Sequence, residues 1–187
     1  MGVFIEESEL KFGEFNEATV FHVEESKQYK ELNISFQSNE GDKKGLSTCE
    51  FVLLRNGALC FIEAKSSCPR ALRENLSEED KAKKKEDYDR FVREISEKMK
   101  DSIELFGTIL LKRHEQTGLS AEMYEAGLVG GQIKPIVVVN TKGAGWNPDP
   151  EVQDSIRGKL GPITKMWNMR PILIINEIKA REKHLIV

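Results

Sequence analysis

The spacing of hydrophobic residues is helical in the middle of the chain. From Ser77 to about His114, apolar side chains recur at steps of three and four, which predicts one long helix with a core-facing stripe. Ser77 is the expected cap, with Asp80 three residues on as an approximate capping box. The first turns, EEDKAKKKED, lack the stripe and should project into solvent. The stripe consists of Tyr88, Phe91, Val92, Ile95, Met99, Ile103, Phe106 and Leu110.

Two short segments, 132–140 and 169–176, are apolar almost throughout, each with a proline near its entry and an asparagine at its exit. Such runs are typical of strands buried on both faces, as in parallel sheets. Between them, Asp149 and Pro150 predict the start of a helix. A crossover helix is the expected connection between parallel strands. The Gly-Pro pair ending at Pro162 should kink or break that helix.

The first part of the chain has a weaker pattern. A strand is expected around Leu10 to Phe15, and a short strand over 34–37. Residues 16–32 have two interpretations: a helix capped by Asn16, which we favour, or a strand built on TVFHV. The expected order is then α-β-β-β-α-β-α-β, in which the first element is either a helix or a strand. This order indicates an α/β layered domain.

A hairpin is expected over EFVLLRNGALCFIEAK, residues 50–65, because Asn-Gly between two apolar runs favours a two-residue type I′ turn. In that register Arg55 faces Ala58 and Glu50 faces Glu63. Side chains alternate between the faces of a strand, so Glu50, Glu63 and Lys65 lie on one face. The remaining residues of both faces are mostly apolar, which places the hairpin in the centre of the sheet.

Two facing acids in this position suggest a metal site. Opposed side chains have Cβ atoms about 4.5–5.5 Å apart, a distance at which Glu50 and Glu63 would repel each other. A divalent cation between them would make the pair favourable, and oxygen ligands suit Mg²⁺ or Mn²⁺. Lys65 would reach the same space. A cation beside an ammonium can hold a phosphate and an activated water. The alternative is a charged strand end in which Lys65 only neutralises the acids.

An acid on one strand, a tight hairpin and Glu63-Ala64-Lys65 on the next strand resemble the PD-(D/E)xK nuclease superfamily, which includes restriction endonucleases. The resemblance covers a core of about 16–140, with 141–187 as an extension of a single domain, 1–187. It implies a restriction-endonuclease-like three-layer α/β/α fold with a central mixed β-sheet. It also implies Mg²⁺-dependent hydrolysis of phosphodiester bonds, most naturally in DNA. The first acid of the family is usually aspartate, and here it is glutamate.

The resemblance assigns roles to individual residues. Glu50 and Glu63 would bind Mg²⁺, with Mn²⁺ as a substitute, helped by the backbone carbonyl of Ala64. Lys65 would orient or activate the attacking water. Many members add a glutamate from the first helix, for which Glu25 is the candidate and its neighbour Glu24 the fallback. If the segment before them is a strand, this last assignment fails.

Weaker candidates for phosphate contacts follow directly on the lysine: Ser66, Arg70 and Arg73. The net charge of −3 gives no global signal for nucleic acid, so such contacts would have to form a local patch. No helix-turn-helix or zinc module is visible, and a separate target-recognition protein is therefore a plausible partner. The three cysteines lack metal-binding spacing.

Two other functions fit the sequence. A nuclease-like fold without catalysis could bind nucleic acid or protein as a regulatory module, which the acidic net charge favours. The exposed start of the long helix could mediate self-association, giving a homodimer. The apolar runs are too short to span a membrane, and no signal peptide is recognised, so we expect a cytoplasmic protein.

Overall fold

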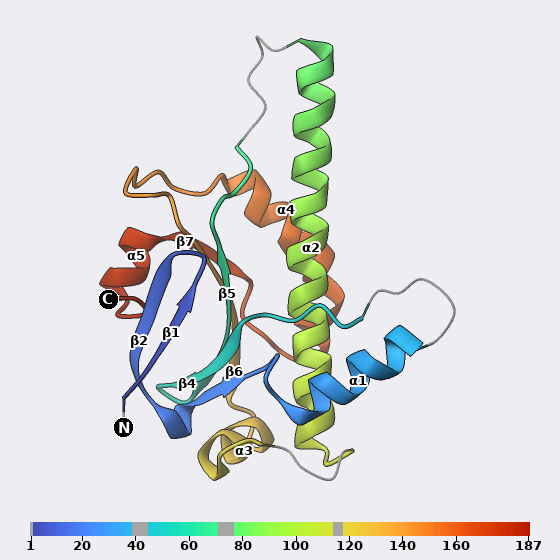
Figure 1. The fold of residues 1–187 in the computed structure, drawn as a ribbon, viewed down its shortest axis with the longest axis vertical. Helices are drawn as coiled ribbons and strands as arrows, with labels where there is room; N and C mark the ends of the chain where they lie inside the picture. Colours follow the sequence, from blue (N-terminus) through green and yellow to red (C-terminus); the bar gives the residue numbers. More distant parts are fainter. Residues whose placement is uncertain (1, 39–44, 71–76, 114–117) are drawn as a thin grey trace.

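The centre of the fold is a mixed five-stranded sheet (Figure 1). The computed structural model describes residues 2–38, 45–70, 77–113 and 118–187, without the side chains of 35–38. The strand order is β3-β4-β5-β6-β7, antiparallel from β3 to β5 and parallel from β5 to β7. The strands are β3 (Val20–His22), β4 (Phe51–Arg55), β5 (Ala58–Lys65), β6 (Gln132–Val139) and β7 (Leu173–Asn176).

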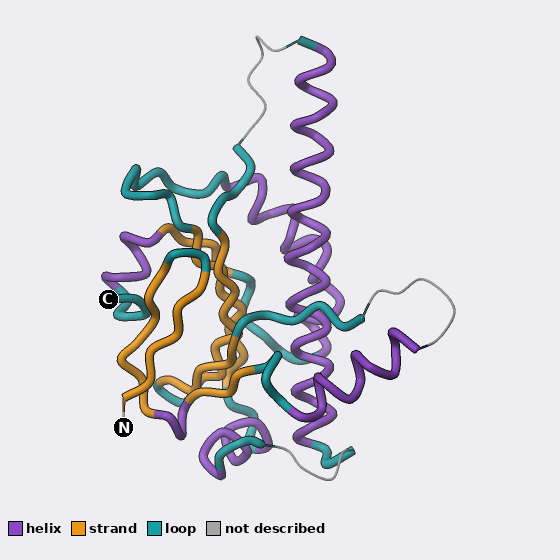
Figure 2. Tube along the Cα trace, viewed as in Figure 1, coloured by secondary structure: helices purple, strands orange, loops and turns teal. Residues whose placement is uncertain are grey.

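Each face of the sheet is covered by different elements, as the strands and helices in Figure 2 show. One face packs on α2 (Glu78–Leu110) and α4 (Pro150–Met166). The other packs on a separate hairpin of β1 (Gly2–Glu7) and β2 (Leu10–Asn16), together with α5 (Glu177–Glu182). The chain is thus an α/β fold whose second outer layer is largely a β-hairpin, rather than the full helical layer expected from the sequence.

The strands and helices with the strongest sequence signals are confirmed. The hairpin of β4 and β5 has the expected register, from Arg55 opposite Ala58 to Phe51 opposite Ile62. The first apolar run forms β6 over nearly its whole length, and the second forms the parallel strand β7 only over its last four residues. Helix α2 begins after Ser77, whose hydroxyl accepts from the amide of Asp80, and its first turns extend beyond the rest of the chain (Figure 1).

The helix α4 is confirmed with Asp149 as its cap and Pro150 in its first turn. It differs from expectation at Pro162, because the helix continues through this residue to Met166. Leu160 and Ile163, which flank the proline, are both buried against the α2 side of the sheet. This packing holds the turn although the proline cannot donate a backbone hydrogen bond.

The helix expected over 16–32 is wrong, and so is the strand over 34–37. Asn16 does cap a turn, but only the short 3₁₀ helix η1 (Glu17–Thr19). The β-favouring TVFHV segment instead pairs with β4 as β3. The true helix, α1 (Lys27–Ser38), starts later, where the hydroxyl of Ser26 accepts from the amide of Tyr29.

Three further short elements were not expected: β1, α5 and α3 (Ala121–Leu128), the last of which lies between α2 and β6. Helix α3 is capped by Ser120 and buries Met123 completely. None of the helices in the described part of the chain is both long and apolar enough to cross a membrane.

Candidate functional site

The hairpin turn determines where the acids of β5 point. Asn56 and Gly57 both have positive φ angles, 50° and 70°, as a type I′ turn requires. With the register set by this turn, Glu63 lies on the same face as Phe61, whose side chain belongs to the core cluster shared with α2. Glu63 therefore points into the layer between the sheet and α2, and Lys65 follows on the same face.

Glu50 lies just beyond the end of β4 rather than within the ladder. The last pair is Phe51 with Ile62, and the amide of Glu50 donates to the carbonyl oxygen of Ile62 at 3.0 Å. The regular opposition of Glu50 and Glu63 is thus replaced by a bend. The bend also brings Cys49 to the α2 side, where its amide donates to Ser102 Oγ at 2.7 Å. Strict alternation along the strand would instead put Cys49 on the face of Phe51, opposite to Glu63.

A lysine from α2 joins the two acids. Lys98 Nζ lies 2.8 Å from Glu63 Oε1 and 3.6 Å from Glu50 Oε1. Lys65 Nζ lies 3.2 Å from the same Glu63 oxygen and also forms an ion pair with Glu94 of α2. The structure thus brings Glu50, Glu63 and Lys65 together, as the sequence predicted, and adds two residues from α2.

Glu94 and Lys98 were missed because their positions on α2 say nothing about β5. They are one helical turn apart and border the apolar stripe, because each directly precedes a buried residue of that stripe, Ile95 and Met99. Lysines and glutamates bordering a stripe are usual on a solvated helix flank. A charged pair at this spacing, on the helix that follows an acid-x-lysine strand, is the only signal that could have identified them.

The carboxylate of Glu63 is enclosed but incompletely satisfied. Its side chain is 0% exposed, and its Oε2 has no hydrogen-bond partner among the described residues, whereas Oε1 lies 2.8 Å from Lys98 Nζ and 3.2 Å from Lys65 Nζ. A buried carboxylate oxygen without hydrogen bonds is costly, and it is a natural ligand for a cation.

The pKa values follow from burial and from the neighbouring charges. Burial raises the pKa of Glu50 to about 7, and the charge of Glu63 adds to this while Lys98 opposes it. Burial likewise raises the pKa of Glu63, against the influence of Lys98 and Lys65. Burial alone would lower the pKa of Lys98, but the carboxylates of Glu63 and Glu50 outweigh it and raise that pKa. A cation at this site would favour the ionised form of both acids.

The donor set fits Mg²⁺ or Mn²⁺ only if waters or a phosphate complete the coordination. In the described part of the chain, no group of three or more histidine, cysteine, aspartate or glutamate side chains could hold a metal ion. Glu50 and Glu63 would be two carboxylate ligands, and Mg²⁺ is commonly bound by one or two carboxylates while keeping several waters. Ala64 stands between Glu63 and Lys65 in β5, with its side chain buried on the opposite face.

The third acidic residue is not where the sequence placed it. Glu25 is exposed in the turn between β3 and α1, because the segment before it is a strand. Its assignment as a helix-borne ligand therefore fails. Glu24 lies nearer the site, since its charge acts on both Glu50 and Lys98. It is exposed, however, and is not a buried ligand.

Of the two phosphate-contact candidates that the structure describes, Ser66 and Arg70, only Ser66 lines a cleft at the end of β5. This cleft, about 440 Å³ in volume, runs between the end of β5 and α2 and is bordered by Lys65, Glu94 and Arg90. Arg70 is instead stacked on Trp146, with its guanidinium carbon 4.6 Å from the ring centroid. Arg73 lies outside the described residues. Arg90, which the sequence interpretation passed over, is the arginine that lines the cleft, where it pairs with Asp87.

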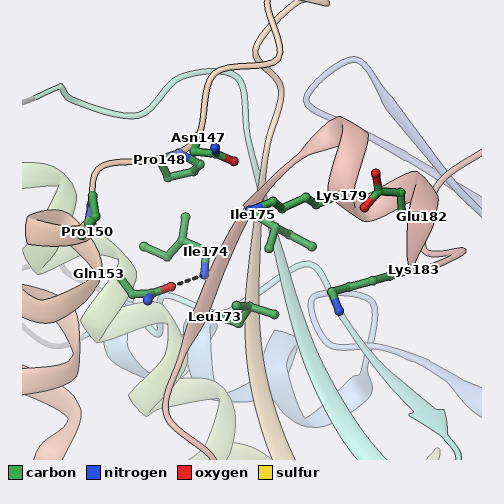
Figure 3. Close-up of a pocket in the computed structure, with 10 residues that line it drawn as sticks. All are labelled: Asn147, Pro148, Pro150, Gln153, Leu173, Ile174, Ile175, Lys179, Glu182 and Lys183. Atoms are coloured by element: carbon green, nitrogen blue, oxygen red, sulfur yellow. Dashed lines mark hydrogen bonds between the residues drawn. The ribbon is translucent and has the colours of Figure 1, made fainter.

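A second cavity, of about 780 Å³, lies at the β7 edge of the sheet and contains none of the predicted site residues (Figure 3). Its wall comes from β7, α5 and the beginning of α4. There the amide of Ile174 donates to Gln153 Oε1 at 2.9 Å, which covers a backbone donor of the edge strand. Of the predicted site residues, Lys65 and Ser66 line the β5–α2 cleft, whereas Glu50 and Glu63 line neither that cleft nor this cavity.

No protein-family model, curated protein or solved structure matches this chain. Its function is therefore inferred from its residues and their geometry.

Proposed function

We propose that this protein is a metal-dependent nuclease of the PD-(D/E)xK type that hydrolyses phosphodiester bonds of DNA. The observation that carries the proposal is the fully buried carboxylate of Glu63, whose Oε2 has no hydrogen-bond partner among the described residues, next to Glu50 and Lys65. Two converging carboxylates and an ammonium at the open end of a buried strand match the chemistry that metal-assisted hydrolysis needs.

The arrangement of the elements supports a restriction-endonuclease-like core. The antiparallel pair β4–β5 is followed by the long helix α2 and by β6, which is parallel to β5. One feature departs from the order expected of the family. Helix α1 lies between β3 and β4 and not before the three strands, so it cannot contribute the glutamate that many members carry there.

Each residue of the site has a distinct role in this proposal. Glu50 and Glu63 would hold Mg²⁺ or Mn²⁺, and the bound cation would supply an activated water and polarise the phosphate. Lys65 would donate a hydrogen bond to the attacking water and orient it. Glu94 contacts the Lys65 ammonium and would keep it in place. Arg90, in the adjoining cleft, would contact a phosphate of the substrate.

One observation favours the second candidate, a nuclease-like module without catalysis. Lys98 and Lys65 already neutralise Glu63, and Lys98 also pairs with Glu50, so the acids have partners without a cation. Charged clusters of this kind also occur as structural networks. A cleavage assay separates the two candidates.

The test is cleavage of single- and double-stranded DNA, and of RNA, with Mg²⁺ or Mn²⁺. We expect Glu63→Gln to abolish cleavage, because the variant loses a charged ligand without losing volume. Lys65→Met should reduce the rate by about 10²–10⁴-fold, the range for a group that acts on a proton in the transition state. Matched controls are Glu122→Gln and Lys83→Met, which carry the same substitutions at exposed positions of α3 and α2.

Full activity in both site variants, or cleavage that persists in excess chelator, would contradict the proposal. Wild-type protein that cleaves none of these substrates would favour the module without catalysis.

A further inference from the structure

Lys98 stands where the proposed cation would bind. Its ammonium approaches one oxygen of each acid, at 2.8 Å from Glu63 and 3.6 Å from Glu50. The side chain is mostly buried, with 16% of its surface exposed, and reaches the acids across the layer between α2 and the sheet. It is the only described lysine or arginine with an ion pair to both acids.

The other lysine of the site cannot take this place. Lys65 contacts Glu63 but is shared with Glu94, so part of its charge is already compensated by an acid outside the pair. No ion pair joins it to Glu50 within the described residues. Lys98 is therefore the main cation between the buried carboxylate of Glu63 and the partly buried carboxylate of Glu50. Removing one partner of a buried ion pair is strongly destabilising.

We infer that Lys98 is the resident counter-ion of this site and that a divalent cation binds by displacing its ammonium. The inference rests on the proposed function, since it concerns the same two carboxylates. Mg²⁺ binds carboxylate oxygens at about 2.0–2.1 Å, so a cation that uses these oxygens would take the same space as the ammonium. Two positive charges a few ångströms apart also repel each other strongly in a partly buried site.

Lysine is suited to such an exchange. Its compact ammonium sits on a flexible four-carbon stem, and the exposed part of the Lys98 side chain gives it a path toward solvent. The exchange has a regulatory consequence. Without metal, Lys98 neutralises the charge of the two acids and fills the space between α2 and the sheet. With metal, its ammonium moves to the edge of the site. Metal affinity is then set by the competition between the two cations.

The direct test is the reactivity of Lys98 in the wild-type protein. Trace acetylation with acetic anhydride, read residue by residue by mass spectrometry, is compared with and without saturating Mn²⁺. We expect acetylation of Lys98 to increase severalfold with Mn²⁺, while Lys83, exposed on the first turns of α2, does not change. This measurement needs no variant to fold.

The second arm is calorimetry of Mn²⁺ binding at pH 8 with Lys98→Met. Removal of the competing ammonium should tighten binding by about tenfold, within the usual range of coupling between two ligands. Lys100→Met is the matched control, because it removes an exposed charge of the same helix outside the site and should leave affinity unchanged. In the acetylation experiment, Lys65, which also lies beside Glu63, is the internal reference for a purely electrostatic effect of the cation on a nearby amine, so displacement predicts a larger increase at Lys98 than at Lys65.

Unchanged acetylation of Lys98 at a saturating Mn²⁺ concentration would overturn the inference, and so would the absence of Mn²⁺ binding. A failure of the proposed nuclease function would give a different result from a failure of this inference. A protein that shows the exchange on Mn²⁺ binding but cleaves no nucleic acid would contradict the proposed function and support the inference.

Discussion

Glu50 and Glu63 belong to the same hairpin but have different surroundings. Glu63 is enclosed, whereas 17% of the Glu50 side chain is exposed. Burial raises the pKa of Glu50 to about 7, well above the ordinary value of 4.5. The folded protein therefore holds this proton more tightly than the unfolded chain does. The stabilising contribution is complete below pH 4.5 and is lost as the pH rises through about 7.

We predict that Glu50→Gln removes this part of the pH dependence. Without divalent cations, the unfolding free energy of the wild type should fall between pH 5 and pH 8 by roughly 1–3 kcal/mol more than that of the variant. Urea unfolding in the presence of a chelator measures the difference. Glu122→Gln, on the surface of α3, should retain the wild-type dependence. If wild type and Glu50→Gln show parallel pH profiles, the burial argument for Glu50 is wrong.

At the scale of elements, the β4–β5 hairpin depends on its turn. Gly57 has a φ of 70°, a conformation that residues with a Cβ adopt at a cost, although a Cβ built there would meet no atom within 4 Å. Any penalty at this position is thus a backbone effect and not a clash. Gly158, inside α4, likewise has open space around a built Cβ, but its φ is helical.

These two glycines should respond to the same substitution with opposite signs. Gly57→Ala should destabilise the protein by about 1 kcal/mol, because it forces a strained φ. Gly158→Ala should stabilise it by about 0.5–1 kcal/mol, because alanine is the better helix former. Urea unfolding of both variants measures the two changes. A loss of stability at Gly158 as large as that at Gly57 would show that packing, and not backbone conformation, decides the outcome.

The elements that could be predicted from the sequence are those with one dominant local signal. Helix α2 has a long stripe and a cap at Ser77, and the hairpin has its Asn-Gly turn. In residues 16–38 the helix and strand signals conflict. The segment TVFHV forms a strand because it pairs with β4. Ile34 and Phe36 favour strands by their intrinsic propensity, yet both lie within α1. Propensity alone therefore predicts the wrong element for this segment.

The candidate site divides in the same way. The turn register was enough to place Glu63 and Lys65 on one face, because alternation along a regular strand is reliable. The turn register did not predict the bend at Glu50, because Glu50 lies beyond the last strand pair, Phe51 with Ile62. Lys98 was not predicted, since the spacing of charges on α2 is a weak signal and the packing of α2 over β5 selects one lysine from the many on that helix.

In the whole molecule, β5 is the strand at which the sheet changes direction. It is antiparallel to β4 and parallel to β6. The chain leaves β5 at Lys65 and returns through α2, which must cross one face of the sheet before β6 can begin beside the start of β5. That face is the one bearing Glu63, so the topology itself brings an α2 side chain to the acids.

The central claim is that Glu50 and Glu63 form a binding site for a divalent cation, and Mn²⁺ titration calorimetry tests it most directly. The wild-type protein at pH 8 should show saturable binding. Glu63→Gln, which keeps the shape of the side chain but removes its charge, should bind too weakly to detect, while Glu122→Gln should bind as the wild type does. Absence of binding to the wild type, or equal binding by Glu63→Gln, would contradict the account.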